Sequence, residues 1–214
     1  MGRRNEHSRE ELKALALRAA GDIVAESGAA ALSMREVARR IGYTVGALYI
    51  VFENLDDLIV HVNEQTIIEL RAALERIRGR ANQPAQNLRL LVAAYFGFAL
   101  LHTARWRLVF EHRLPEGQKA PQTYAGHTAA IFALVSDRLR QAGITRDAAS
   151  TAELATALWS GAHGICMLAV TGKLQVATQA SVQRLLDVLL DRFLVNGDSP
   201  HSLAKGAGPR GRRS

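Results

Sequence analysis

Cysteine, proline and long uncharged apolar runs are all scarce in this sequence, and each scarcity excludes a class of structure. The 214 residues include one cysteine, Cys166, so an internal disulfide is excluded and a reducing, cytoplasmic location is expected. Five prolines leave long segments without a helix breaker. No stretch of about 18 uncharged apolar residues occurs, and the N-terminus lacks the apolar core of a signal peptide, so we expect no membrane contact.

Continuous strand patterns are absent as well, whereas alanine- and leucine-rich helical periodicity runs nearly from end to end. This pattern predicts an all-α fold of about nine helices. Asn54, Thr145 and Thr178 are the expected N-caps of the fourth, eighth and ninth helices, because their side chains can accept hydrogen bonds from backbone N–H groups. The expected helices cover 8–27, 34–41, 45–51, 55–78, 84–102, 104–112, 124–141, 146–170 and 179–195.

The segment 33–52, SMREVARRIGYTVGALYIVF, predicts two short helices around a glycine turn. Ser33 and Glu36 fit a capping box at the start of the first helix, Gly42 supplies the turn, and Thr44 fits the N-cap of the second. A helix pair joined in this way is a helix-turn-helix, whose second helix enters the major groove of DNA. Double-stranded DNA is therefore the expected partner.

Four kinds of side chain in and near this motif could contact DNA. Hydroxyl groups suit phosphates, small residues allow close approach, apolar residues suit thymine methyls, and arginines suit phosphates or base edges. Arginines of an N-terminal arm can also reach an adjacent groove. The candidates are Thr44 and Tyr49 for phosphates, Gly46 and Ala47 for close approach, Val45, Ala47 and Ile50 for thymine methyls, Arg35 for a charged contact, and Arg3 and Arg4 in the arm.

The charge of the chain supports a polyanionic partner only in part. The net charge is +7, which favours nucleic acid. Residues 1–60 nevertheless hold 8 Lys/Arg against 9 Asp/Glu, so the helix-turn-helix region is not basic overall. DNA binding there depends on where the arginines are placed, and Arg39 and Arg40 remain open between phosphate contacts and simple solvated charges.

Aromatic and histidine side chains are concentrated between residues 95 and 163, where they predict a cavity for a small-molecule effector. Ordinary core packing is the alternative for each of them. No HExxH motif, Cys/His metal spacing or nucleophile elbow occurs, so we expect no metal, no cofactor, no catalytic residue and no enzymatic activity. The candidate ligand-binding residues are Phe98, His102, Trp106, Phe110, Tyr124, His127, Trp159 and His163.

The last two predicted helices, 146–170 and 179–195, carry apolar stripes wider than one core needs. They are therefore expected to form a homodimer, with burial inside one subunit as the alternative. The predicted organisation has an N-terminal three-helix helix-turn-helix domain, which a long helix joins to a helical bundle for ligand binding and dimerisation. Its parts are a flexible basic arm at 1–7, the helix-turn-helix domain at 8–60, the ligand-binding and dimerisation domain at 61–196, and a disordered basic tail at 197–214.

The segment SMREVARRIGYTVGALYIVFENLDDL resembles the TetR family of transcriptional regulators, in its turn, Gly46, the Leu48–Tyr49 pair and Phe52. LWSGAHGICMLA is similar to a subgroup named for a Trp-His-Gly signature, through Trp159, His163 and Gly164. The resemblance implies an Ω-shaped homodimer whose last two helices form a four-helix bundle with those of the partner. It also implies a repressor that a small ligand releases from a palindromic operator.

Four positions depart from the family pattern. Val45, Ile50, Val51 and Leu55 stand where the family often carries polar, aromatic or lysine side chains. These changes remove phosphate and base contacts. The alternative reading is therefore a helical ligand-binding or enzymatic protein whose DNA-binding head is degenerate.

Overall fold

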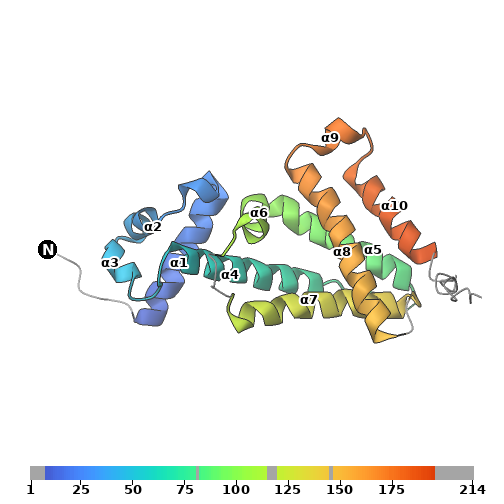
Figure 1. The fold of residues 1–214 in the computed structure, drawn as a ribbon, viewed down its shortest axis with the longest axis horizontal. Coiled ribbons are helices and arrows are strands. Elements are labelled where there is room, and N and C mark those ends of the chain that lie inside the picture. The colour runs from blue at the N-terminus through green and yellow to red at the C-terminus, as the bar shows by residue number, and fades with distance from the viewer. Residues whose placement is uncertain (1–7, 81, 115–119, 145–146, 196–214) are drawn as a thin grey trace, which may run out of the picture.

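The computed structural model describes residues 8–80, 82–114, 120–144 and 147–195, and these contain ten α-helices, one short 3₁₀ helix and no strand. The predicted all-α class is confirmed. The predicted arm at 1–7, the tail at 197–214 and Thr145 lie outside the described residues. The molecule is elongated, with the N-terminal helices at one end and the last helix at the other (Figure 1).

The N-terminal helices form a small head around the predicted turn. Its helices are α1 (Arg9–Ser27), the 3₁₀ turn Ala29–Ala31, α2 (Met34–Ile41) and α3 (Val45–Leu48). Gly42 ends α2 with a φ of 73°, a left-handed conformation that glycine adopts without steric cost. Helix α3 is shorter than the predicted 45–51, because the N–H groups of Ile50 and Val51 bond to the carbonyls three residues back.

The capping box of the head lies at a different helix from the predicted one. Ser33 accepts a hydrogen bond from the Glu36 backbone N–H, as expected, but the Glu36 carboxylate binds Arg39 and does not return to Ser33. A complete box occurs at α1, where Ser8 and Glu11 each accept the backbone N–H of the other. The Glu36 side chain is diverted because an arginine one turn later offers it a charge-assisted pair.

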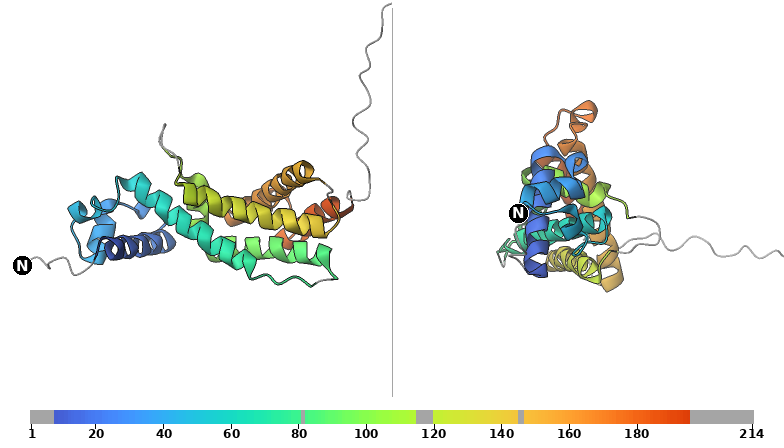
Figure 2. Two further views of the ribbon diagram at one scale, coloured as in Figure 1. Left: turned by 90° about the horizontal axis from the view of Figure 1, so that it is seen from below. Right: turned by 90° about the vertical axis from the view of Figure 1, so that its left-hand side faces the viewer.

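Helix α4 (Leu55–Glu75) runs from the head into the body of the molecule, capped by Asn54 as predicted (Figure 2). Leu58 and Val62 on its first half belong to the core of the head, which also contains Leu48 and Phe52. Three side chains on its second half belong to a separate core in the body, and these are Ile67, Leu70 and Leu74. One continuous helix therefore has its two halves fixed in two different hydrophobic cores.

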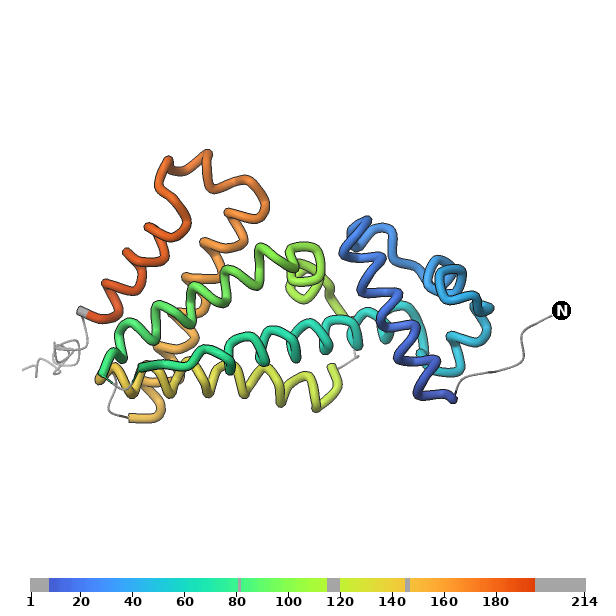
Figure 3. Tube along the Cα trace, turned by 180° about the vertical axis from the view of Figure 1, so that it is seen from behind, coloured from blue at the N-terminus to red at the C-terminus, as the bar shows by residue number. Residues whose placement is uncertain are grey.

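The body is a bundle of helices around this second core. Helix α7 packs along α4, while α5 crosses α8, and α8 and α10 form an antiparallel pair joined through the short α9 (Figure 3). Helices α5 and α6 meet at a bend of 99°. The bounds of the helices are α5 (Pro84–Leu101), α6 (Thr103–Glu111), α7 (Gln122–Gln141), α8 (Ala148–Val170), α9 (Leu174–Ala177) and α10 (Val182–Val195).

The starts of the last two long helices differ from the prediction. The N-cap of α8 is Asp147, which accepts from the backbone N–H of Ser150. Helix α10 starts after Ser181, which accepts from the backbone N–H of Arg184, whereas Thr178 accepts only from Ala180 two residues on. Acidic and serine caps compete with threonine at helix starts, so short-range sequence alone did not select the right one.

Within the described residues, one helix is long and apolar enough to cross a membrane by length and composition, and this is α8. Every stretch of 18 residues in α8 contains Glu153. The helix therefore has no uncharged run of that length, in agreement with the sequence analysis. Helix α8 packs against α7 and α10, yet only 22% of the apolar window is buried. Leu168 of this helix is 42% exposed, whereas Leu154, Ile165 and Met167 are half-buried.

Candidate DNA-binding and ligand-binding sites

The exposed end of the head is formed by the start of α3 and the turn after it. Thr44 is the N-cap of α3, and its Oγ1 accepts a hydrogen bond from the Ala47 backbone N–H at 3.2 Å. The hydroxyl proton of Thr44 stays available for a phosphate oxygen, because the cap uses only a lone pair. Tyr49 and Ile50 are 55% and 57% exposed, which is unusual for large side chains with no partner to cover them.

The predicted DNA contacts divide into exposed and packed residues. Val45 and Ala47 are half-buried against the core of the head, which limits what they can offer to a base edge. Among the described residues, a Cβ built on Gly46 would meet only Thr44 Oγ1, at 3.8 Å, so none of their contacts requires glycine there. The open space beside Gly46 suits the close approach of another molecule. Arg35, Thr44, Gly46, Tyr49 and Ile50 are the exposed members of the predicted set.

The arginines of α2 differ in what they bind. Arg39 is paired with Glu36, at 2.8 and 2.6 Å, and Arg40 is paired with Glu26, at 3.0 and 2.8 Å. These hydrogen bonds hold the pKa values of both carboxyl groups below their usual range. Arg35 is exposed and has no ion pair within the described residues, so its charge is available to an anion. Arg3 and Arg4 lie outside the described residues.

In the body, four of the predicted ligand-binding residues form one aromatic cluster. Trp106 and Phe110 come from α6, and their ring centroids are 5.1 Å apart. Trp159 and His163 come from α8 and are stacked at 5.1 Å. The ring centroid of His163 lies 4.2 Å from that of Phe110 and 5.0 Å from that of Trp106, so the two pairs are in contact. We call these residues, together with Tyr95, the aromatic box.

Tyr95 of α5 completes the aromatic box, although the sequence-based site did not include it. Its hydroxyl lies 2.9 Å from Nδ1 of His163, and its ring meets Trp106 edge-on at 6.1 Å. Burial raises the pKa of Tyr95 and lowers the pKa of His163, so both groups are neutral near pH 7. Phe132 of α7 was missed as well, and its ring lies 5.5 Å from that of Trp159. The sequence places Tyr95 and Phe132 on apolar helix faces. The same pattern is typical of ordinary core residues, so it does not mark either one as part of a site.

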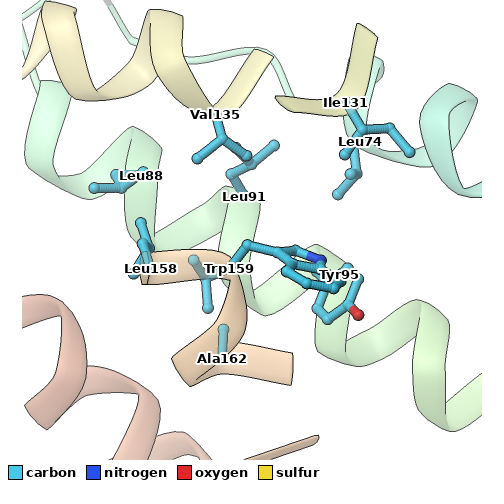
Figure 4. Close-up of a pocket in the computed structure, with 10 residues that line it drawn as sticks. Leu74, Leu88, Leu91, Tyr95, Ile131, Val135, Leu158, Trp159 and Ala162 are labelled. Atoms are coloured by element: carbon cyan, nitrogen blue, oxygen red, sulfur yellow. The ribbon is translucent and has the colours of Figure 1, made fainter. Parts of the chain in front are cut away.

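An apolar cavity of about 30 Å³ adjoins the aromatic box, and Tyr95 and Trp159 line both (Figure 4). This volume is far below the roughly 300–1,000 Å³ typical of small-molecule sites. An effector could enter only if the lining side chains moved apart. The rest of the lining is aliphatic and consists of Leu74, Leu88, Leu91, Val92, Ile131, Val135, Leu158 and Ala162.

The other four predicted ligand residues lie elsewhere, so the predicted set does not form one site. The rings of Phe98 and His102 are tilted against each other at the corner between α5 and α6, with 4.5 Å between their centroids. His127 faces Arg71, with 3.4 Å between its Nδ1 and the guanidinium. Tyr124 lies near Glu64, which acts with burial to raise the pKa of its phenol.

His102 belongs to a polar cleft of about 550 Å³ between the head and the body, lined by parts of α1, α4 and the α5–α6 corner. Arg105 there binds both carboxylate oxygens of Glu69, at 3.0 and 2.8 Å, and lies 3.0 Å from Nδ1 of His102. Burial, aided by the nearby Arg105, lowers the pKa of His102. The two hydrogen bonds between Arg105 and Glu69 connect α6 with α4 at the junction of head and body.

Comparisons with known proteins agree with this architecture. Residues 16–62 match the family described as bacterial regulatory proteins, tetR family, and residues 88–193 match the tetracyclin repressor-like C-terminal domain. The chain is 24% identical over 157 residues to the HTH-type transcriptional regulator Rv1816 of Mycobacterium tuberculosis, covering 72% of this chain and 67% of that protein. It is 29% identical over 138 residues to the HTH-type transcriptional activator FasR of Mycolicibacterium smegmatis, covering 63% of each.

Solved structures show the same fold. A protein of unknown function from Rhodococcus sp. RHA1 superposes with a TM-score of 0.70 at 24% identity, over 89% of this chain and 96% of its own. The repressor FadR of Thermus thermophilus, solved with lauroyl-CoA, gives a TM-score of 0.62 at 17% identity, over 92% and 100%. Similarity to the Trp-His-Gly subgroup stays a prediction. The two matched segments together span the head and most of the body, and the chain belongs to the tetR family of bacterial transcriptional regulators.

Proposed function

We propose that this regulator is a homodimeric repressor that a small ligand releases from a palindromic operator. The observation that carries the proposal is the exposed surface formed by Arg35, Thr44, Gly46, Tyr49 and Ile50 at the tip of the head. An unpaired cation, a cap hydroxyl and a phenol beside an open glycine suit a phosphate backbone and the groove next to it. The apolar Ile50 fits a thymine methyl better than a polar base edge.

The proposed dimer uses the outer faces of α8 and α10. Leu168 and Val188 are 42% and 40% exposed on these helices, and several other apolar side chains of α8 are only half-buried. Packing both helices against those of a second copy would cover this surface in a four-helix bundle. Two heads held by one symmetric interface could then enter successive major grooves, about 34–36 Å apart or a multiple of that spacing.

Helix α6 supports the proposed coupling between ligand and DNA. Trp106 and Phe110 on this helix belong to the aromatic box, whereas Leu108 between them is buried in the core of the head. A ligand that spreads the box would therefore shift a helix to which the head is packed. The ligand can lower DNA affinity by no more than the ratio of its own affinities for the DNA-bound arrangement and for the arrangement with the spread box. FadR was solved with lauroyl-CoA, so an acyl compound is one candidate for such a ligand, acting in the cytoplasm.

The test is a gel-shift and footprint experiment on DNA upstream of the gene, with a pair of hydroxyl deletions. Tyr49→Phe removes an exposed hydroxyl from the tip of the head, and Tyr124→Phe removes one from the body as the matched control. We expect discrete retarded complexes that random DNA competes poorly, weakened by Tyr49→Phe and unchanged by Tyr124→Phe. A degenerate head, in a protein that only binds a ligand or catalyses a reaction, would give a salt-sensitive smear in all three proteins.

A further inference from the structure

A buried hydrogen-bond donor in the aromatic box has no partner. Trp106 is 1% exposed, and its indole Nε1 makes no hydrogen bond within the described residues. The indole lies close enough to the Tyr95 hydroxyl to influence its pKa, but not in hydrogen-bonding geometry. An indole N–H can only donate, and leaving one buried without an acceptor is unfavourable, because the donor loses its hydrogen bond to water and gains none. The chain retains this donor although phenylalanine would fill much of the same space.

The groups around this donor are polar but uncharged. The Tyr95 hydroxyl and His163 Nδ1 are 2.9 Å apart and satisfy each other. The remaining members of the aromatic box, Phe110 and Trp159, carry no formal charge, and the adjoining cavity is aliphatic. The Cys166 thiol nearby is protonated, since burial raises its pKa to about 12. A carboxylate placed here would lose its hydration without gaining a cation.

We propose that the effector carries an uncharged hydrogen-bond acceptor, such as the carbonyl of a ketone, ester or thioester, which accepts from Trp106 Nε1 in the aromatic box. The apolar remainder of the ligand enters the adjoining cavity, which Tyr95 and Trp159 also line, and the aliphatic side chains around that cavity move apart to admit it. Phe110, Trp159 and His163 are only half-buried, so the ligand reaches Trp106 past these three side chains. This assignment rests on the proposed ligand-responsive function and names the chemistry of its ligand.

The chain contains its own reporter for this site. It has two tryptophans, Trp106 and Trp159, and both belong to the aromatic box. The full-length protein is titrated at pH 7.5 with 2-octanone, n-octane and heptanoate, which have similar length and differ in their acceptor and charge. We expect saturable changes in tryptophan emission, with 2-octanone binding about 5–10-fold more tightly than n-octane, as one net hydrogen bond predicts. Heptanoate should bind most weakly.

Two variants separate the hydrogen bond from the packing of the ring. Trp106→Phe removes the donor and keeps an aromatic ring, and should erase the preference for 2-octanone over n-octane while Trp159 still reports. Tyr124→Phe, outside the aromatic box, should keep the preference. Thermal melting checks that Trp106→Phe is folded at the temperature of the titrations.

Three results would overturn the assignment: equal affinity for ketone and alkane, tightest binding of heptanoate, or no saturable change with any probe. A preference for ketone that persists in Trp106→Phe would do the same. Gel shifts without any probe keep the two proposals apart. If DNA binding is intact and ketone selectivity is absent, only the ligand class is wrong. If ketone selectivity is present and specific DNA binding is absent, the repressor function is wrong and the site remains.

Discussion

Trp106 and Leu108 are two residues apart on α6 and are buried in different hydrophobic cores. Trp106 is packed in the core of the body with Tyr95, whereas Leu108 is packed in the core of the head. The Asn63 amide of α4 donates to the Leu108 carbonyl at 3.4 Å, which fixes α6 at the junction. This short helix is therefore the part of the body through which the aromatic box and the head are in mechanical contact.

Leu108→Ala should make unfolding less cooperative, because it removes a contact that joins the two cores. Circular dichroism reports all helices, while tryptophan emission reports only the body, where both tryptophans lie. The two denaturation curves should coincide in the parent and separate in Leu108→Ala, with helix content lost first as the head unfolds. Leu101→Ala, at a side chain 78% exposed on the α5–α6 corner, is the control and should keep the curves together. Coincident curves in Leu108→Ala would show that α6 does not hold the head.

Leu48 at the end of α3 and Ile50 in the turn after it differ in burial and give contrasting variants. Leu48 is fully buried in the core of the head, so Leu48→Ala should lower the free energy of unfolding by about 2–5 kcal/mol. Ile50 is 57% exposed, so Ile50→Ala should change stability by less than about 0.5 kcal/mol and weaken operator binding. Urea denaturation and gel shifts measure the two effects. Unchanged DNA affinity in Ile50→Ala would remove this side chain from the interface.

Arg35 should account for one phosphate contact per head, because it is the exposed arginine of α2 whose charge is not paired within the described residues. Arg35→Gln should weaken binding to specific and random DNA alike, and should reduce the slope of log affinity against log salt by about 1 per contact. Arg39→Gln is the matched control, since Glu36 already binds that guanidinium. Equal loss of slope in both variants would mean that the Glu36 pair opens on DNA.

Lower pH should destabilise the protein through His163 and His102. Burial lowers the pKa of both below the ordinary value of 6.5, so the unfolded chain takes up protons that the folded chain does not. Their contribution to stability is therefore present above pH 6.5 and is lost as the pH falls through the folded pKa values. Melting temperatures between pH 7.5 and 5.5 should fall less steeply in His163→Gln and least in the double variant with His102→Gln. An unchanged slope in the double variant would assign the pH dependence to other groups.

Sequence-based prediction succeeded where a feature depends on neighbours along the chain. The cap hydrogen bonds of Thr44 and Asn54 and the left-handed Gly42 follow from residues within a few positions. The aromatic box could not be assembled in this way, because Tyr95 and His163 are 68 positions apart and meet only when α5 crosses α8. Periodicity places both on buried faces, but it does not distinguish a pair that contacts from two unrelated core residues.

Two glycines of α8 test the packing of the proposed dimerisation helices. A Cβ built on Gly161 would lie 3.0 and 3.1 Å from the two methyl carbons of Leu189 on α10, whereas no atom of the described residues outside its own helix comes within 4 Å of one on Gly164. In Gly161→Ala, Leu189 must give way by a few tenths of an ångström, so this variant should be less stable than Gly164→Ala in urea denaturation at fixed protein concentration. Gly164→Ala should gain up to about 1 kcal/mol within a subunit, since alanine favours a helix. A loss at Gly164, relieved on dilution to the monomer, would place the second subunit directly over that residue and give the dimer its contact face.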